Sequence, residues 1–447
     1  MKLTRRNFMS SAVAAGAAFT IVPSHVLGGT KHIAPSEKLN IAAIGSGGQG
    51  FSNINACSKE NIVALCDVNY ASAAKTFKKY PNAKQFKDFR IMLDKMDKDI
   101  DAVIVATPDH THAVAAMKSM KMGKHVYCQK PLTHTVYEAR KLTETAREMG
   151  VATQMGNQGH SGSGCRRIKE WIADGAIGDV REVHCWTNRP VWPQGILRPT
   201  DTPPVPKGLD WDLWLGPAPV RPYNPAYLPF NWRAWYDFGC GALGDMACHI
   251  MDAAYMSLDL KYPISVQASR GEQVKEMWKR VENNETYPNA SVVHYSFPAR
   301  GEMPPVKVHW YDGGILPEVP EELGSRGLGG SGTIFVGDKG KIMSFTYGND
   351  PMLLPRSLHK SYKQPEPTIK RIKGSHEQNW IDACKGGDPA CSNFDYSGPF
   401  TEMVVMGNFA IRMPGKLLKW DGPNMKVTNN EAANALVHKE YRKGWTL

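Results

Sequence analysis

The amino-acid sequence predicts a two-domain α/β protein. Between residues 39 and 158, short apolar or β-branched runs alternate with longer helical stretches, which is typical of a parallel sheet covered by helices. After Gly159 this rhythm stops, and longer stretches of alternating polar and apolar residues predict a second sheet. A length of 447 residues also favours two domains over one. We therefore place the domains at 39–158 and 159–447.

The first domain is predicted to alternate strands and helices from its first residues. Strands are expected at 39–44, 62–66, 102–106, 125–128 and 152–155. Helices are expected between them, at 70–80, 111–122 and 134–149. This order predicts a Rossmann-like domain, in which ligands bind in the crevice at the carboxyl ends of the strands. The loops after these strands are therefore expected to carry the site.

The second domain is predicted from three strands and two closing helices. The strands are expected at 291–297, 306–311 and 332–336, and the helices at 376–385 and 398–412. The segment 186–236 precedes them and is dense in Pro, Trp and Tyr. Its aromatic rings, with Arg189, Arg198 and Arg233, would suit a sugar-binding wall, but they would equally suit a subunit interface.

The first 29 residues differ from the rest of the chain. They contain no acidic residue, the pair Arg5 and Arg6, and then a small apolar run at 12–22. This pattern resembles a twin-arginine export signal, so we expect residues 1–29 to be removed, 30–38 to form an N-terminal arm, and the protein to be periplasmic. The run is shorter than the ~20 residues that cross a bilayer, which argues against a stable membrane anchor.

The net charge of +11 does not predict nucleic-acid binding. Lysines and arginines are scattered and interrupted by acidic residues, whereas nucleic-acid-binding segments gather them into a patch or an arm. We therefore expect a solvated basic surface and no nucleic-acid partner.

A glycine-rich turn follows the first strand and matches the pattern G-x-G-x-x-G. Small residues there let the backbone approach a pyrophosphate at a helix N-terminus. Asp67 ends the second strand 22 residues after Gly45, where a carboxylate can bind both adenosine-ribose hydroxyls and repel a 2′-phosphate. NAD is therefore expected rather than NADP. The predicted binding residues of the turn are Gly45, Ser46, Gly47, Gly48, Gln49 and Gly50.

Two further loops are expected at the same crevice. After the strand at 102–106 come Thr107, Pro108, His110 and His112, of which the histidines would approach the cofactor or instead start a helix facing solvent. After the strand at 125–128 come Gln129, Lys130 and Pro131. An ammonium beside a positively charged nicotinamide should lose its proton more readily, as a proton-accepting lysine requires.

A second glycine-rich turn, at 239–244, leads into a predicted helix. Asp245, His249 and Asp252 are spaced i, i+4 and i+7, so they are expected on one helix face. They would form a metal site, a buried polar network, or an acid/base pair. In such a pair His249 exchanges a proton with a substrate hydroxyl, and Asp245 orients His249 or contacts the same substrate. We prefer the last and expect no metal, because no second ligand cluster stands out.

Taken together, these motifs resemble the Gfo/Idh/MocA family of oxidoreductases. The resemblance covers essentially everything from Leu39 onward. It implies a second domain built on an open, mainly antiparallel sheet that carries substrate and subunit contacts, and hence a homo-oligomer, either a dimer or a tetramer. It also implies that Lys130, Asp245 and His249 form the catalytic trio. Two positions depart from the family pattern, because Gln129 replaces the usual Glu before Lys-Pro and Cys240 replaces the central Gly of the second turn.

Three classes of function follow from this interpretation. The first is NAD-dependent hydride transfer from a hydroxyl of a sugar, glycoside or polyol, with a tightly bound cofactor. The alternative is an NAD-dependent glycosidase or lyase that oxidises a sugar carbon transiently and so permits elimination. The third is a sugar-binding protein without activity, which the intact Lys130, Asp245 and His249 disfavour. We expect the first.

Overall fold

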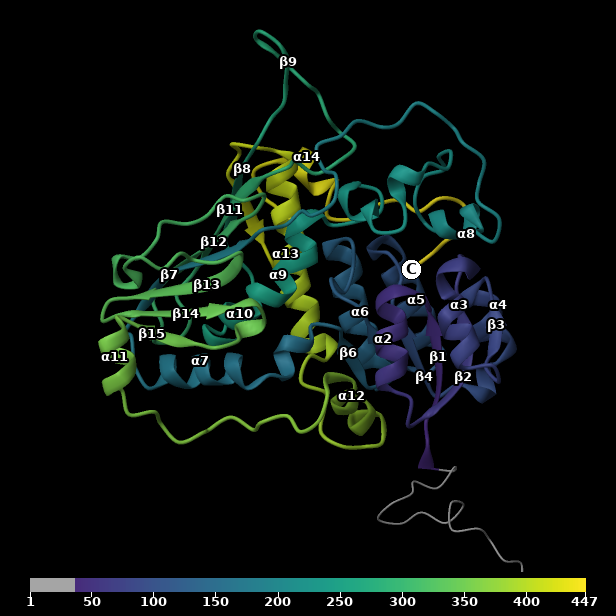
Figure 1. Cartoon of the computed structure of the whole chain (residues 1–447), viewed down its shortest axis with the longest axis horizontal. Helices are drawn as coiled ribbons and strands as arrows, with labels where there is room; N and C mark the ends of the chain where they lie inside the picture. The colour runs from purple at the N-terminus through teal and green to yellow at the C-terminus, as the bar shows by residue number, and fades with distance from the viewer. Residues whose placement is uncertain (1–36) are drawn as a thin grey trace, which may run out of the picture.

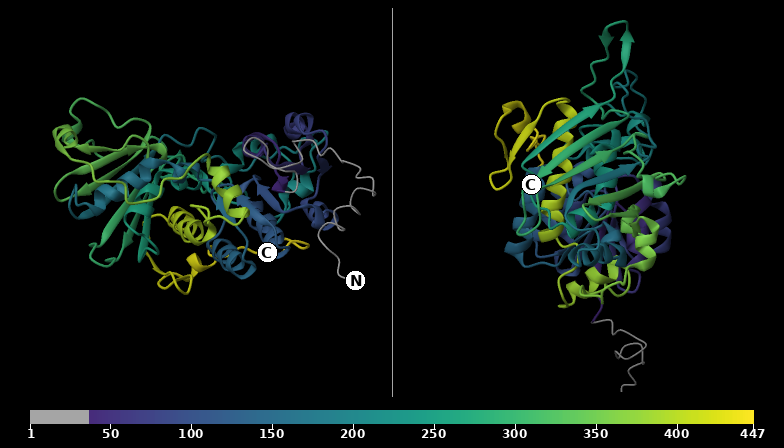
Figure 2. Two further views of the ribbon diagram at one scale, coloured as in Figure 1. Left: turned by 90° about the horizontal axis from the view of Figure 1, so that it is seen from below. Right: turned by 90° about the vertical axis from the view of Figure 1, so that its left-hand side faces the viewer.

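Two large sheets lie side by side in the protein, each covered by helices (Figures 1 and 2). The computed structural model describes residues 37–447. The predicted signal peptide, 1–29, and most of the predicted arm, 30–38, lie outside the described residues. Within the described part, every helix is too short or too polar to cross a membrane.

The first sheet is parallel, with the strand order β3-β2-β1-β4-β5-β6. This is the strand order of a Rossmann fold, so the predicted Rossmann-like domain is confirmed. The sequence did not reveal β3, because it is a short and largely exposed edge strand without an apolar pattern. The strands are β1 (Asn40–Ile44), β2 (Asn61–Cys66), β3 (Lys84–Phe86), β4 (Ala102–Val105), β5 (His125–Cys128) and β6 (Thr153–Met155).

Three helices pack on each face of this sheet. One face carries α2 (Gly48–Ala56), α3 (Tyr70–Lys79) and α12 (His376–Cys384), and the other carries α4 (Phe89–Lys95), α5 (Asp109–Lys121) and α6 (Val136–Met149). Helix α6 begins two residues later than predicted, because Thr135 and Glu138 form a capping box.

Contrary to our expectation, helix α12 does not close the second domain. Its Trp380 and Ile381 are buried in the same apolar cluster as Ile41 of β1. Lys385, directly after the helix, also pairs with Glu60 before β2, at 2.7 Å. The chain therefore returns to the first sheet after building the second.

The second sheet has nine strands in the order β15-β14-β13-β7-β12-β11-β8-β16-β17. Every neighbouring pair is antiparallel except β7 with β12, so the sheet is mainly antiparallel, as expected. Its strands are β7 (Val180–Thr187), β8 (Ser265–Arg270), β11 (Ser291–Phe297), β12 (Val306–Tyr311), β13 (Ser331–Gly337), β14 (Lys341–Phe345), β15 (Met352–Leu354), β16 (Leu418–Asp421) and β17 (Lys426–Val427).

One face of this sheet is covered by helices, and burial along β11 alternates residue by residue as a one-sided sheet requires. The covering helices are α7 (Ser163–Ala173), α9 (Gly241–Ile250), α10 (Asp252–Ser257) and α13 (Phe394–Arg412). Helix α13 begins four residues before the predicted start, because Asn393 caps it. The remaining short elements are α8 (Trp211–Leu215), α11 (Arg356–Ser361), α14 (Glu431–Asn434) and the projecting hairpin of β9 (Val274–Glu276) and β10 (Lys279–Arg280).

Candidate active site

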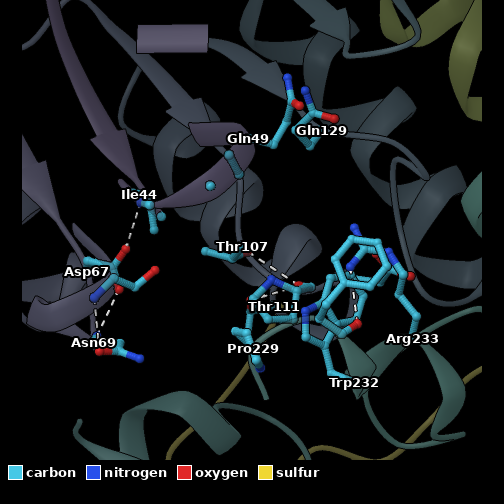
Figure 3. Close-up of a pocket in the computed structure, with 18 of the residues that line it drawn as sticks. Ile44, Gln49, Asp67, Asn69, Thr107, Thr111, Gln129, Pro229, Trp232 and Arg233 are labelled. Atoms are coloured by element: carbon cyan, nitrogen blue, oxygen red, sulfur yellow. Dashed lines mark hydrogen bonds between the residues drawn. The ribbon is translucent and has the colours of Figure 1, made fainter. Parts of the chain in front are cut away.

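A cavity of about 630 Å³ opens at the carboxyl ends of the first sheet. The loops after β1, β2, β4 and β5 line one side, and α9 with the aromatic segment of the second domain lines the other. Figure 3 shows Asp67 and Asn69 at one end, Trp232 and Arg233 at the other, and Thr107 between them. The cavity is therefore shared by the two domains.

The glycine-rich turn after β1 allows close backbone packing at the cavity. A Cβ atom at Gly45, which has φ +84°, would collide with the Ala106 carbonyl oxygen, and one at Gly50 with the Gly45 carbonyl oxygen. At Gly48, which has φ +50° and begins α2, a Cβ atom would meet no other atom within 4 Å, so this residue faces open space. This cradle fits a pyrophosphate, which would lie against the N-terminus of α2. Gly45, Gly47, Gly48 and Gln49 line the cavity, whereas Ser46 and Gly50 lie behind it.

Asp67 stands in the cavity wall where the prediction placed it. One carboxylate oxygen accepts hydrogen bonds from the backbone N–H groups of Ser46 and Gly47, at 2.8 and 3.2 Å, and the other accepts from Asn69 N–H at 2.8 Å. Burial raises the pKa of the Asp67 carboxyl, and the three N–H donors oppose that rise. The carboxylate is thus fixed beside the glycine turn, as an adenosine-ribose acceptor should be.

Of the loop after β4, Thr107 and Pro108 line the cavity but the two predicted histidines do not. His110 is buried with its ring nitrogens 3.2 and 3.0 Å from the carbonyl oxygens of Phe238 and Trp214. His112 is buried between the carbonyl oxygens of Pro131 and Thr107, at 2.9 and 2.8 Å. Both side chains are buried, and their contacts hold the neighbouring loops in place. Neither histidine lines the cavity in which the cofactor is expected.

Lys130, Asp245 and Arg233 form a charged network in the cavity wall. Lys130 Nζ donates to the Asp245 carbonyl oxygen at 2.5 Å and to Oδ1 at 2.9 Å, while Arg233 Nε donates to the same Oδ1 at 3.0 Å. Burial alone would raise the pKa of Asp245, but the two cations outweigh it and hold that pKa well below its ordinary value. Lys130 is therefore paired with the carboxylate of Asp245, another member of the expected trio.

His249 lies one helical turn from Asp245, in the same wall. The residue is 5% exposed, and within residues 37–447 its Nδ1 has no hydrogen-bond partner. Its ring meets the edge of Tyr347, with the centroids 4.8 Å apart. Burial, reinforced by the charge of Lys130, holds the pKa of His249 well below its ordinary value. The structure thus places a neutral imidazole in the cavity wall, with its Nδ1 buried.

Asp252 does not share this face, contrary to the helical spacing. Helix α9 ends at Ile250, and Asp252 begins the separate helix α10 after Met251. Its carboxylate lies 3.0 Å from His160 Nδ1 and accepts from the Tyr396 hydroxyl at 2.5 Å, outside the cavity lining. In the described part of the chain, no group of three or more His, Cys, Asp or Glu side chains is arranged to hold a metal ion.

Asp109 is a cavity residue that the sequence analysis missed. It is the first residue of α5 and only 3% exposed, and its Oδ2 accepts from Cys240 N–H at 3.0 Å. Burial raises the pKa of Asp109 to about 7, against the opposing charges of Arg233 and Lys130. The sequence did contain a signal for Asp109. Its carboxyl comes directly after Thr-Pro, at the start of a helix that faces the crevice.

The two departures from the family pattern have structural explanations. Gln129 lines the cavity and donates through Nε2 to Asn53 Oδ1 at 2.9 Å, and Asn53 in turn donates to Glu377 of α12 at 2.9 Å. The amide therefore ties the lysine loop to both α2 and α12. Cys240 has φ −111°, which any residue can adopt, whereas Gly241 has φ +64° and needs glycine.

The aromatic segment contributes directly to the cavity. Trp214, Phe230 and Trp232 line it, together with Arg233 and Arg189. Arg198 does not, because it pairs with Glu285 at 2.7 Å away from the wall. Two of the three arginines expected near a substrate are thus at the cavity.

The fold and this cavity define an oxidoreductase with an NAD-binding Rossmann domain. Residues 39–157 match the family model described as "Oxidoreductase family, NAD-binding Rossmann fold", and residues 180–293 match "Oxidoreductase family, C-terminal alpha/beta domain". Together the matches span just over half of the chain. The protein belongs to the Gfo/Idh/MocA family.

Named relatives act on cyclic sugars and polyols. Levoglucosan dehydrogenase of Pseudarthrobacter phenanthrenivorans is 26% identical over 191 residues, which are 42% of this chain and 40% of that protein. D-glucoside 3-dehydrogenase of Escherichia coli is 28% identical over 150 residues, which are 32% of this chain and 42% of that protein. The matched region thus spans about two fifths of these relatives' length.

Solved structures share the fold across both domains. The WlbA dehydrogenase of Bordetella pertussis, in complex with NADH and UDP-GlcNAcA, aligns with a TM-score of 0.60 and 16% identity, over 86% of this chain and 99% of that one. An inositol dehydrogenase homologue of Azotobacter vinelandii, complexed with NADH and myo-inositol, aligns with a TM-score of 0.55 and 17% identity, over 86% and 98%. At these identities the likeness establishes the fold.

Proposed function

We propose that this protein is an NAD-dependent dehydrogenase that oxidises a hydroxyl group of a sugar, glycoside or polyol. The observation that carries the proposal is that His249 lines the same cavity as the Lys130–Asp245 pair and the glycine turn. Oxidation of a carbinol needs a proton acceptor at the oxygen and a dinucleotide at the carbon, and this cavity has room and groups for both.

The residues of the chain then take distinct roles. Gly45–Gly48 and Asp67 would hold the pyrophosphate and the adenosine ribose. The chemistry that a bound nicotinamide supplies is acceptance of a hydride. Neutral His249 receives the hydroxyl proton on its imidazole, and Lys130 Nζ donates a hydrogen bond to the same oxygen. Asp245 positions Lys130, since its carboxylate and its carbonyl oxygen both accept from Nζ.

The substrate class is inferred from the wall opposite the glycine turn. Phe230 and Trp232 offer flat apolar faces of the kind that pack against pyranose rings, and Arg233 and Arg189 offer hydrogen-bond donors to hydroxyl or carboxylate groups. The named relatives act on levoglucosan and a D-glucoside, both of them cyclic polyhydroxy compounds. A pyranose or a cyclitol therefore suits the cavity best.

Asp109 favours one second candidate, cleavage of a glycosidic bond through transient oxidation. That route needs an additional group able to take a proton from carbon and return one to oxygen. A buried carboxyl in the cavity wall whose pKa is about 7 suits such a task. This candidate keeps the roles of His249 and Lys130 and differs in its products.

The proposal also covers where the protein is located and how it assembles. We propose export to the periplasm by the twin-arginine route, on the basis of Arg5, Arg6 and the apolar run that follows. We also propose a homo-oligomer, because alternate side chains of β11, on the sheet face without helices, are only half-buried and could contact another copy.

Product analysis on a panel of glycosides, free sugars and cyclitols tests the proposed function. The wild-type protein should form a keto-sugar while an equal amount of its bound NAD is reduced, and His249→Ala should do neither. His438→Ala provides a matched control, because this histidine is exposed and lies outside the cavity. Bond cleavage without net NADH would favour the second candidate, and no product with any compound would contradict both.

A further inference from the structure

The last residues of the chain cross back onto the first domain. This C-terminal strap, residues 439–447, follows α14 and is anchored on α6, where the Tyr441 hydroxyl donates to Glu138 at 2.6 Å. It is anchored again on α8, where Arg442 pairs with Asp212 at 2.5 Å. These side-chain bonds fix its course between the two domains.

Trp445 occupies the part of the strap that reaches the cavity. The Arg90 guanidinium lies 4.3 Å from the centre of its ring, and the ring of Phe89 lies 6.0 Å away. Arg90 is itself held by both carboxylate oxygens of Asp88, at 2.7 to 3.1 Å, and donates to the Gly444 carbonyl oxygen at 3.3 Å. The indole is half-buried and is one of the cavity-lining side chains. The indole of Trp445 therefore packs against Arg90 on one side and faces the cavity on another.

The strand order places Trp445 at one end of the cavity. Phe89 and Arg90 begin α4, directly after the edge strand β3, and Asp67 follows β2, its neighbour. Lys130 follows β5, on the other side of β1. The indole thus lies on the adenosine side of the glycine turn, where Val68 and Asn69 also line the wall.

We propose that Trp445 is a binding residue for the adenine of the dinucleotide and that the strap retains the cofactor by closing this end of its site. The proposal rests on the dinucleotide binding that the proposed function requires. An indole offers a flat face on which a purine stacks, and Arg90 on its supported side keeps the ring in place. An adenine ring bound there would lie under a segment tied to both domains, so its release would require the strap to move.

The test compares the affinities of NAD and of ADP-ribose, which lacks nicotinamide, by titration calorimetry. Trp445→Ala should weaken the binding of both ligands by the same factor, about 5- to 100-fold, as removal of one aromatic face from a stacked base does. Trp445→Phe should restore most of the loss. Trp278→Ala is the matched control, because Trp278 is 94% exposed on the β9–β10 hairpin and lies outside the cavity.

Thermal unfolding of the same variants, without ligand, separates binding from support of the fold. A purely structural role predicts that Trp445→Ala lowers the unfolding temperature while NAD and ADP-ribose bind within about twofold of wild type, and this result would overturn the proposal. Loss of NAD affinity with unchanged ADP-ribose affinity would also overturn it, because the indole would then act on the nicotinamide half. A wild-type protein that binds neither ligand would refute the proposed function itself.

Discussion

Replacing Asp109 by asparagine should stabilise the folded protein at alkaline pH and change it little at acid pH. Asp109 is 3% exposed, and burial raises its pKa from 3.8 to about 7. The folded state therefore binds a proton between these values that the unfolded chain releases, and the free energy of unfolding falls as the pH rises through this window. Asparagine keeps an oxygen that can accept from Cys240 N–H but cannot ionise.

The size of the stability difference follows from the pH range in which the folded protein holds a proton that the unfolded chain has lost. Between about pH 5 and the folded pKa of about 7, each pH unit costs the wild-type protein about 1.4 kcal/mol, so some 3 kcal/mol is lost by about pH 8.5. Asp109→Asn avoids this loss. The gain of the variant over wild type should hence be about 3 kcal/mol larger at pH 8.5 than at pH 5.

Urea unfolding at the two pH values, without added cofactor, measures this difference. Asp94→Asn is a suitable control, because it removes an exposed carboxylate paired with Lys118 and should have a similar small effect at both pH values. An Asp109→Asn variant that is destabilised equally at both pH values would refute the reasoning, because Arg233 and Lys130 would then keep Asp109 ionised throughout.

Four further results are expected. His249→Ala and Lys130→Met should each lower turnover by roughly two to four orders of magnitude with little change in NAD affinity by calorimetry, since positioned proton-transfer groups contribute about that much; a mild effect of both would contradict their assignment. Asp67→Ala should weaken NAD binding and reduce the preference for NAD over NADP. Unchanged affinities for both dinucleotides would show that the adenosine ribose binds elsewhere. Gly50→Ala should abolish NAD binding, because its Cβ atom would collide with the Gly45 carbonyl oxygen. Protein purified from periplasm should retain NAD(H) through gel filtration, whereas protein without cofactor that needs added NAD for every turnover would contradict tight binding.

The fold was largely predictable because its information is local. Buried strands such as β4 and β5 are continuous apolar runs, and loops of Gly, Pro and Asn separate them. Edge strand β3 lacks that signal. The placement of α12 required tertiary information, because an apolar helix face does not indicate which sheet will cover Trp380.

Some residues of the site could likewise be predicted from the sequence, and others could not. Gly45, Asp67 and Lys130 follow strands of one parallel sheet, so topology alone brings them to one crevice. Side-chain direction is harder to predict, and it decides that Asp109 faces the cavity while His110, the next residue, turns into the protein. The spacing of Asp252 assumed one continuous helix, whereas the structure divides this stretch into α9 and α10 at Met251.

The return of α12 and of the C-terminal strap to the first domain determines when that domain can be completed during synthesis. Its sheet begins at residue 40, yet Trp380 packs on one face of that sheet and Trp445 lines its cavity. A ribosome must therefore make nearly the whole chain before the dinucleotide site exists. Contacts over such sequence separations form late in folding. We thus expect a fragment ending near residue 158 to expose a bare apolar surface and to aggregate, and cofactor loading to mark the finished protein.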